Sequence, residues 1–92
     1  MVMERITGVA LLSPVSGLHR LPNPNRHWDV IREMCGTGFG DDVHDAEQGF
    51  VTSLDRFVDR REGLAIALAS GQISEDTRPV PGLPELFSED LW

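Results

Sequence analysis

Four basic residues lie where the sequence predicts two helices to begin, a pattern typical of an anion site. Arg26 and His27 open the first predicted helix, Arg60 opens the second, and Arg56 lies in the turn just before it. A helix start presents free N–H groups and a positive dipole end, and the arginine fork suits phosphate. If the two helices lie side by side on a sheet, we expect Arg26, His27, Arg56 and Arg60 to bind a small phosphorylated ligand or nucleotide.

A structural role for the same residues is the alternative. Arg60 and Arg61 have acidic neighbours in Asp59 and Glu62, with which they can form surface ion pairs. His27 then fills a position at the rim of the core. Positive charge at a helix start is unfavourable for the helix itself, and such local inconsistencies often mark functional positions.

Catalytic chemistry has little support in the sequence. The single cysteine, Cys35, has no local signature of a nucleophile, and we expect it to be buried on the apolar face of the first helix. The glycines of residues 36–40 lack the preceding strand and following lysine of a phosphate loop. The nearby Asp41, Asp42, His44 and Asp45 match no known zinc or calcium loop. We therefore expect a non-enzymatic protein with no cofactor and no metal.

Large apolar residues near the C-terminus form a second candidate site. They stand among acidic residues, and side chains of this size seldom remain free in water. They either fold back onto the domain, or onto a second copy in a homo-oligomer, or they dock in a groove on a partner protein. The residues are Leu86, Phe87, Leu91 and Trp92.

The charge balance narrows the classes of partner. The chain has 92 residues, a formal net charge of −7 and eight basic residues, all of them arginine. An acidic surface disfavours direct nucleic-acid binding and confers solubility or attraction to a basic protein groove. The acids in question are Asp41, Asp42, Asp45 and Glu47. A single cysteine and the absence of a long apolar run predict a protein of a reducing cytoplasm that does not enter a membrane.

A fold must position these candidate residues. The pattern of apolar, turn and capping residues predicts an α+β fold of order β-β-α-β-β-α. A small antiparallel sheet of two hairpins should carry two helices on one face. The predicted strands are residues 5–12, 18–21, 50–52 and 57–58, and the predicted helices are residues 26–35 and 60–70. We expect a single domain over residues 1–73, a Pro-rich linker over 74–84 and a C-terminal arm over 85–92.

The two helices are predicted from different signals. Asp59 followed by Glu62 is a capping box, and Gly71 is the natural stop of the second helix. In the first helix the hydrophobic spacing predicts one apolar face, made of Trp28, Ile31, Met34 and Cys35.

Several of these stretches together resemble a group of small proteins from phages and prophages of proteobacteria. The shared pattern is R-H near a helix start, then G-F-V-T-S, R-F-V-D-R-x-E, I-A, G-Q and a terminal S-E-D-L-W. In this sequence the stretches are Arg26-His27, Gly49–Ser53, Arg56–Glu62, Ile66-Ala67, Gly71-Gln72 and Ser88–Trp92. Two departures are Asp55 in place of a turn glycine and Gly63 in place of a helical alanine, which should weaken the helix by about 1 kcal/mol.

The resemblance implies a phage or prophage origin, and small phage proteins of this kind commonly antagonise host defence. On that basis the leading hypothesis is a binder that sequesters a small phosphorylated ligand or nucleotide. The alternative is an acidic inhibitor that blocks a host defence protein complex, as anti-CRISPR proteins do. A third hypothesis is a structural accessory of the phage particle.

Overall fold

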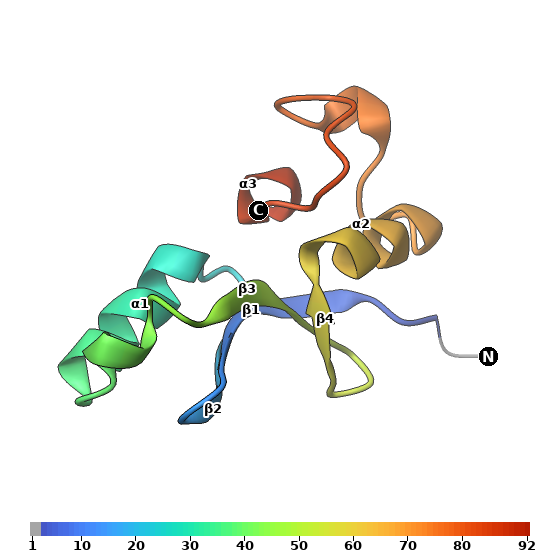
Figure 1. Ribbon diagram of the computed structural model, residues 1–92. Helices are drawn as coiled ribbons and strands as arrows, with labels where there is room; N and C mark the ends of the chain where they lie inside the picture. Colours follow the sequence, from blue (N-terminus) through green and yellow to red (C-terminus); the bar gives the residue numbers. More distant parts are fainter. Residues whose placement is uncertain (1–2) are drawn as a thin grey trace.

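The computed structural model describes residues 3–92 and contains one antiparallel sheet of four strands in the order β2-β1-β3-β4 (Figure 1). The predicted α+β class and the order β-β-α-β-β-α are confirmed. The strands are β1 (Ile6–Ser13), β2 (Gly17–Pro22), β3 (Glu47–Thr52) and β4 (Phe57–Asp59). The helices are α1 (His27–Gly36), α2 (Arg60–Ala69) and the short α3 (Ser88–Leu91), with 3-10 turns η1 (Gly40–Asp42) and η2 (Glu75–Thr77).

Short polar side chains stabilise both hairpin turns. In the first turn, Ser13 Oγ accepts hydrogen bonds from the N–H groups of Val15 and Ser16, both at 3.0 Å. In the second turn, Asp55 adopts a φ of 59°, in the left-handed region. Aspartate tolerates this conformation because its short side chain can bond to the local backbone. The departure from glycine at this position therefore leaves the turn intact.

The predicted cap of α2 is present. Asp59 Oδ1 accepts a hydrogen bond from the backbone N–H of Glu62 at 2.8 Å, which satisfies one free donor of the first turn. The carboxylate of Glu62 bonds Arg56 at 3.2 Å, so the reciprocal half of a capping box is replaced by an ion pair. At the other end, Gly71 has a φ of 77° and its N–H bonds the carbonyl of Leu68.

The buried face of α1 differs from the predicted one. The helix buries His27, Val30 and Met34, whereas Trp28 is 65% exposed and Cys35 is exposed. Met34 is buried and Ile31 is partly buried against the core, as predicted. Trp28 and Cys35 were misplaced because the hydrophobic pattern treats histidine as a surface residue. His27 can be buried because its ring bonds the carbonyl of Gly49 in β3. The prediction that Cys35 is buried is therefore also wrong.

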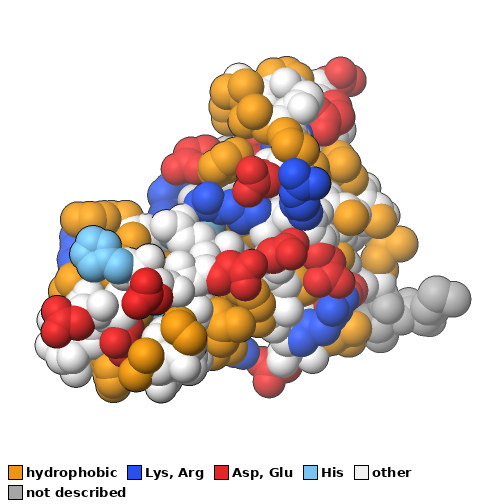
Figure 2. All heavy atoms as spheres, viewed as in Figure 1, with side chains coloured by type: hydrophobic (Ala, Val, Ile, Leu, Met, Phe, Trp, Pro, Cys, Tyr) orange, Lys and Arg blue, Asp and Glu red, His pale blue; other side chains and the backbone are white. Residues whose placement is uncertain are grey.

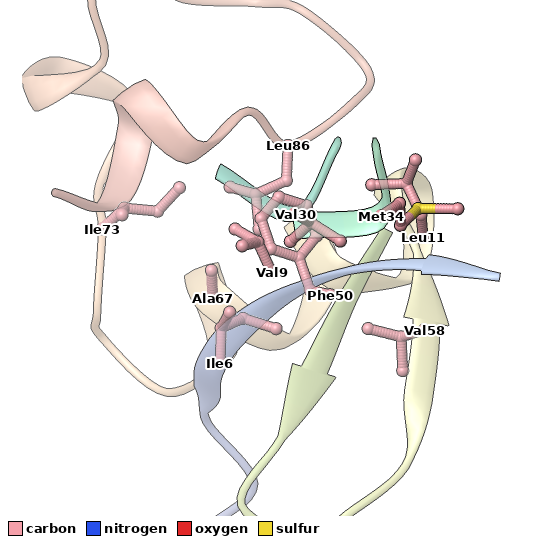
Figure 3. Close-up of a cluster of buried hydrophobic side chains, with 10 residues drawn as sticks. All are labelled: Ile6, Val9, Leu11, Val30, Met34, Phe50, Val58, Ala67, Ile73 and Leu86. Carbon is pink, nitrogen blue, oxygen red and sulfur yellow. The ribbon is translucent and has the colours of Figure 1, made fainter. Parts of the chain in front are cut away.

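Both helices pack on one face of the sheet, as predicted, with α1 against β1 and β2 and α2 against β3 and β4. The apolar cluster between the layers is drawn in Figure 3, where Leu86 enters from the C-terminal part of the chain. The members of this cluster are Ile6, Val9, Leu11, Val30, Met34, Phe50, Val58, Ala67, Ile73 and Leu86.

Gly63 in α2 allows the helix to approach this cluster closely. A Cβ atom at this position would lie 3.1 Å from Cδ2 of Phe50 and 3.3 Å from Cδ2 of Leu86. Contacts of this length require both neighbours to shift. The glycine therefore gives up some helix propensity in exchange for close packing of α2 on Phe50 and Leu86.

Residues 74–92, which we call the C-terminal segment, fold back across the helix layer (Figure 1). The segment contains η2, then a loop, then α3, and it reaches the starts of both main helices. The N–H of Leu86 bonds the carbonyl of Arg60 at 2.9 Å, and Nε1 of Trp92 donates to the carbonyl of Asn25 at 2.8 Å. The C-terminal segment therefore connects the beginning of α1 with the beginning of α2.

On the face of the sheet opposite the helices, atoms of the strands themselves cover the central backbone. Gly8 and Gly49 are buried there, and the ring of Phe57 lies over Gly49. Arg20 Nη1 of the edge strand β2 also donates to Asp55 Oδ1, in the turn between β3 and β4, at 2.5 Å. Glycine in the central strands β1 and β3 thus permits close approach of the Leu21 and Val58 carbonyls and of the Phe57 ring.

Replacing Gly49 with alanine is expected to lower the free energy of unfolding by about 1–3 kcal/mol. The new Cβ would lie 2.3 Å from the carbonyl oxygen of Val58 and 2.6 Å from ring carbons of Phe57, so backbone must move. Urea denaturation measures the effect. Gly36→Ala is the matched control, because nothing lies within 4 Å of a Cβ at that position. Equal stabilities of the two variants would contradict the close contacts of Gly49 with Val58 and Phe57.

Candidate functional site

The sequence-predicted anion residues lie in two separate places. Arg26, His27 and Arg60 lie at the starts of α1 and α2, and Arg26 and Arg60 contact Trp92 and Phe87 of the C-terminal segment. Arg56 lies in the turn between β3 and β4, where it forms a different cluster. Three of the four predicted residues therefore share a location, and the fourth does not.

Arg26 is engaged by the C-terminal segment. Its Nη2 donates to the carbonyl oxygen of Trp92, and its Nη1 lies 3.6 Å from Oε1 of Glu89, an ion pair without a hydrogen bond. Within residues 3–92, this buried Nη1 has no hydrogen-bond acceptor. The backbone N–H of Arg26 donates to the carboxylate of Asp29 at 2.7 Å, which steadies the first turn of α1.

His27 is buried between α1 and the sheet. Its Nε2 lies 2.7 Å from the carbonyl oxygen of Gly49, so Nε2 carries the proton and donates it. The imidazole meets the ring of Phe50 edge-on, with ring centroids 5.0 Å apart. Burial is the main cause that lowers the pKa of His27 from 6.5; nearby Arg60 lowers it further, while the bond to Gly49 and the charge of Glu89 act in the opposite direction. The ring is therefore neutral at pH 7 and serves the packing of α1 on β3.

Arg60 lies between the sheet and the C-terminal segment. Its Nη2 donates to Oε1 of Gln48 at 2.5 Å, and its guanidinium carbon lies 4.8 Å from the centroid of the Phe87 ring, a cation–π contact. In the described part of the chain, its buried Nε has no hydrogen-bond partner. Beside Arg60 is an open hollow of about 390 Å³, lined by Glu47, Gln48, Asp59, Arg60, Arg61 and Glu85.

Arg56 is held by two carboxylates. Its Nε and Nη2 bond Glu4 at 2.7 and 2.8 Å, and its Nη1 bonds Glu62 at 3.2 Å. The hydrogen bond from Arg56, followed by one from Thr52, lowers the pKa of Glu4 to about 2, and the two carboxylates raise the pKa of Arg56. This bidentate arrangement joins the N-terminal stretch to the second hairpin and to α2.

Unlike Arg26 and Arg56, the acidic residues within 41–47 are not paired with opposite charges in the described part of the chain. Asp41, Asp45 and Glu47 are exposed and Asp42 is partly so. Among residues 3–92 none of these four carboxylates forms an ion pair, whereas half of the eight arginines do. Acidic side chains recur across the face shown in Figure 2. Residues 41–47, from η1 to the first residue of β3, therefore present an unneutralised negative surface, which we call the acidic loop.

The apolar residues of the predicted arm contribute to the domain's own packing. Leu86 is 0% exposed within the central cluster, and Leu91 and Trp92 pack against that cluster. Phe87 is partly buried over Arg60. Each of the four residues thus has a partner within the chain.

Arg78 is a central residue that sequence reasoning missed. Its side chain is 0% exposed and donates to both oxygens of Asp90 at 3.3 Å, to Glu75 at 2.9 Å, and to the carbonyls of Leu83 and Glu85 at 2.8 Å. The hydrogen bonds that Arg78 donates to Asp90 and then to Glu75 outweigh burial and raise the pKa of Arg78. The signal was available: Arg78 is the one basic residue in a stretch that is otherwise acidic and Pro-rich.

The described residues contain neither a cluster of metal-ligand side chains nor a membrane-spanning helix. In residues 3–92, no group of three or more His, Cys, Asp or Glu side chains is arranged to hold a metal ion. No helix of the described chain has the length and apolar character needed to cross a bilayer.

The unfolding free energy is expected to fall as the pH drops below about 6.5, because of His27. Burial lowers the pKa of His27 in the folded protein below its value of 6.5 in the unfolded chain. The unfolded chain therefore binds the proton first, and stability is lost between 6.5 and the lower folded pKa. Urea denaturation from pH 7.5 to 5.5 measures this loss. His27→Gln keeps an amide donor for the carbonyl of Gly49 but does not titrate. Its unfolding free energy should therefore change less with pH than that of wild type. Equal slopes would refute the role of His27 in the pH dependence.

Comparison with known proteins gives one family and no individual relative. Neither a curated protein nor a solved structure matches the chain. The family described as phage T4 y16D protein matches residues 11–92, from the second half of β1 to Trp92. This range includes both main helices, the acidic loop and the C-terminal segment. The expectation of a phage protein is thereby confirmed at the level of the family. Because the match extends over most of its length, the chain belongs to the phage T4 y16D protein family.

Proposed function

We propose that this phage-family protein is a non-enzymatic accessory that binds a basic surface of a host protein through its acidic loop and blocks that surface. The observation that carries the proposal is the unequal use of charge. Asp41, Asp42, Asp45 and Glu47 form no ion pair among residues 3–92, whereas Arg26 and Arg56 are neutralised by carboxylates of their own chain.

Binding through such a loop follows from simple electrostatics. Four carboxylates on a short exposed segment, in a chain of net charge −7, attract a positively charged surface over roughly a Debye length of about 10 Å. Long-range attraction of this kind raises the rate of association and selects basic partners over acidic ones. Proteins that bind nucleic acid carry such basic surfaces, which makes them the natural class of target.

The test compares neutralised variants as baits in host cells. Asp41→Asn with Asp45→Asn should reduce recovery of the partner by about tenfold or more at low salt, with a smaller difference at high salt. Glu33→Gln with Asp55→Asn is the matched control, because it removes the same charge from exposed residues that belong neither to the acidic loop nor to the C-terminal segment. Recovery that is equal for both double variants, or insensitive to salt, would refute a role for the acidic loop.

The hollow beside Arg60 supports a second candidate, capture of a small phosphorylated ligand or nucleotide. Arg60 and Arg61 line this hollow, and the buried Nε of Arg60 has no hydrogen-bond partner in residues 3–92. A phosphate oxygen could satisfy that donor. The surrounding Glu47, Asp59 and Glu85 oppose a highly charged anion, so this candidate ranks second.

Native mass spectrometry of the protein from infected cells separates the two candidates. A small added mass that is lost on denaturation, and that is absent from Arg60→Ala but present in Arg32→Ala, supports ligand capture. Arg32 is an exposed arginine of α1 and controls for loss of charge. A bare protein, or a complex with a host polypeptide, refutes it.

A further inference from the structure

The C-terminal segment carries an apolar groove on its outer surface. The groove encloses about 310 Å³, which is at the lower end of the range for ligand pockets. Val80 is 55% exposed and Leu83 is 36% exposed, so the apolar lining is open to solvent. Hydrophobic side chains gather at the top of the view in Figure 2, where Figure 1 places the loop after η2. The lining residues are Pro79, Val80, Leu83, Phe87, Glu89 and Asp90.

Arg78 fixes the shape of this groove from beneath. Its guanidinium bonds the carbonyl of Leu83 on one side and Asp90 on the other, so the loop and α3 are joined under the lining. The carboxylate of Glu75 bonds both Arg78 and the N–H of Gly82 at 2.9 Å. A groove built on buried hydrogen bonds is already formed before a partner arrives, which spares the entropic cost of ordering a loop.

The charge around the groove is negative. The C-terminal segment contains five acidic residues and one basic residue, Arg78, whose side chain is fully buried. Glu89, in the lining itself, is 62% exposed. Arg78 pairs with Glu75 and Asp90, and Arg26 pairs with Glu89 at 3.6 Å without a hydrogen bond. Five carboxylates against these two arginines still leave the segment's surface negative, and Asp76 and Glu85 form no ion pair among residues 3–92.

We propose that the groove binds an apolar side chain of a partner protein, presented on a segment in which arginine or lysine flanks that side chain. The apolar walls formed by Pro79, Val80, Leu83 and Phe87 supply the contact, and the surrounding acids select the basic flanks. The groove is a surface distinct from the acidic loop. The proposal therefore stands or falls independently of the function assigned to that loop.

Charge also argues against two other occupants. A second copy of the chain carries the same net charge of −7, so its approach would bring acidic surfaces together. An anionic membrane surface would be repelled by the same carboxylates. A basic, apolar protein segment is the occupant that matches both the lining and the rim.

The test uses the full chain and three short fluorescent peptides, read by anisotropy. The first has a Leu-Phe pair flanked by arginines, the second has glutamates in place of the arginines, and the third has serines in place of Leu-Phe. We expect only the first to bind well, and we expect Val80→Asp or Leu83→Asp to weaken its binding by about tenfold or more. Added negative charge by itself would strengthen attraction to a basic peptide, so the loss isolates the apolar contact.

Controls and contrary outcomes are defined by the same structure. Val15→Asp makes an identical charge change at a residue that is 80% exposed in the first hairpin turn, and it should bind like wild type. Amide chemical shifts of the non-proline residues within 79–87 should move when the first peptide is added to wild-type protein. No binding, equal binding of all three peptides, or shifts confined to other residues would overturn the proposal. Self-association that Leu83→Asp abolishes would overturn it in favour of a second copy.

Discussion

Replacing Arg78 with methionine is expected to lower the free energy of unfolding by about 3–5 kcal/mol. Methionine retains an apolar stem but removes the guanidinium, which leaves the buried carboxylate of Asp90 without its cation and the carbonyls of Leu83 and Glu85 without this donor. A buried charge that loses its partner pays the full cost of desolvation. Thermal and urea denaturation monitored by circular dichroism measure the loss.

A second substitution separates the ion pair from simple packing. Asp90→Asn removes the orphaned charge but keeps an oxygen that can accept from the N–H of Phe87, as Asp90 does at 2.9 Å. Arg78→Met with Asp90→Asn should therefore be more stable than Arg78→Met alone. Arg32→Met, at an exposed arginine of α1, should lie within about 0.5 kcal/mol of wild type. If Arg78→Met behaves like Arg32→Met, Arg78 does not organise the C-terminal segment.

Leu86→Ala is expected to cost about 2–5 kcal/mol, the range for a fully buried leucine. The side chain is 0% exposed and enters the cluster between the two main helices from residues that sequence reasoning treated as an arm (Figure 3). Leu54→Ala, at a leucine that is 58% exposed in the second hairpin turn, is the matched control and should cost far less. Equal melting temperatures for the two variants would mean that the C-terminal segment is not part of the cooperative core.

The close contact with Gly63 gives this prediction a second test. A Cβ at residue 63 would lie 3.3 Å from Cδ2 of Leu86. Leu86→Ala removes that atom, so Gly63→Ala should be tolerated better in the Leu86→Ala background than in wild type. The coupling free energy from the double-mutant cycle should therefore be favourable. A coupling of zero would show that α2 and the C-terminal segment do not compete for this space.

The local elements were predictable because their signals are local. Asp59 caps α2 through a residue three positions away, and Asp55 sits in a turn whose geometry depends on its own φ. The buried face of α1 was not predictable in this way. It depends on a hydrogen bond between His27 and Gly49, residues that are 22 positions apart. Hydrophobic periodicity carries no information about such a bond.

In the candidate site, too, the features with local signals were predictable and the tertiary contacts were not. Sequence placed Arg26 and Arg60 at helix starts, and the helix starts were right to within a residue. It could not indicate that Glu89 and Phe87 would lie over them, nor that Glu4 would hold Arg56, because both arrangements depend on tertiary packing. Arg78 escaped notice since its partners are carbonyls and a carboxylate brought together by the fold of residues 74–92.

The position of Leu86 has a consequence for the order of synthesis. The sheet and both main helices leave the ribosome before this residue does, yet the cluster around Phe50 and Gly63 is completed only when Leu86 arrives. Until then the nascent chain exposes apolar surface that chaperones and proteases recognise. A chain interrupted before residue 86 would keep that surface exposed. The cell's own quality control would therefore remove unfinished copies and spare complete ones.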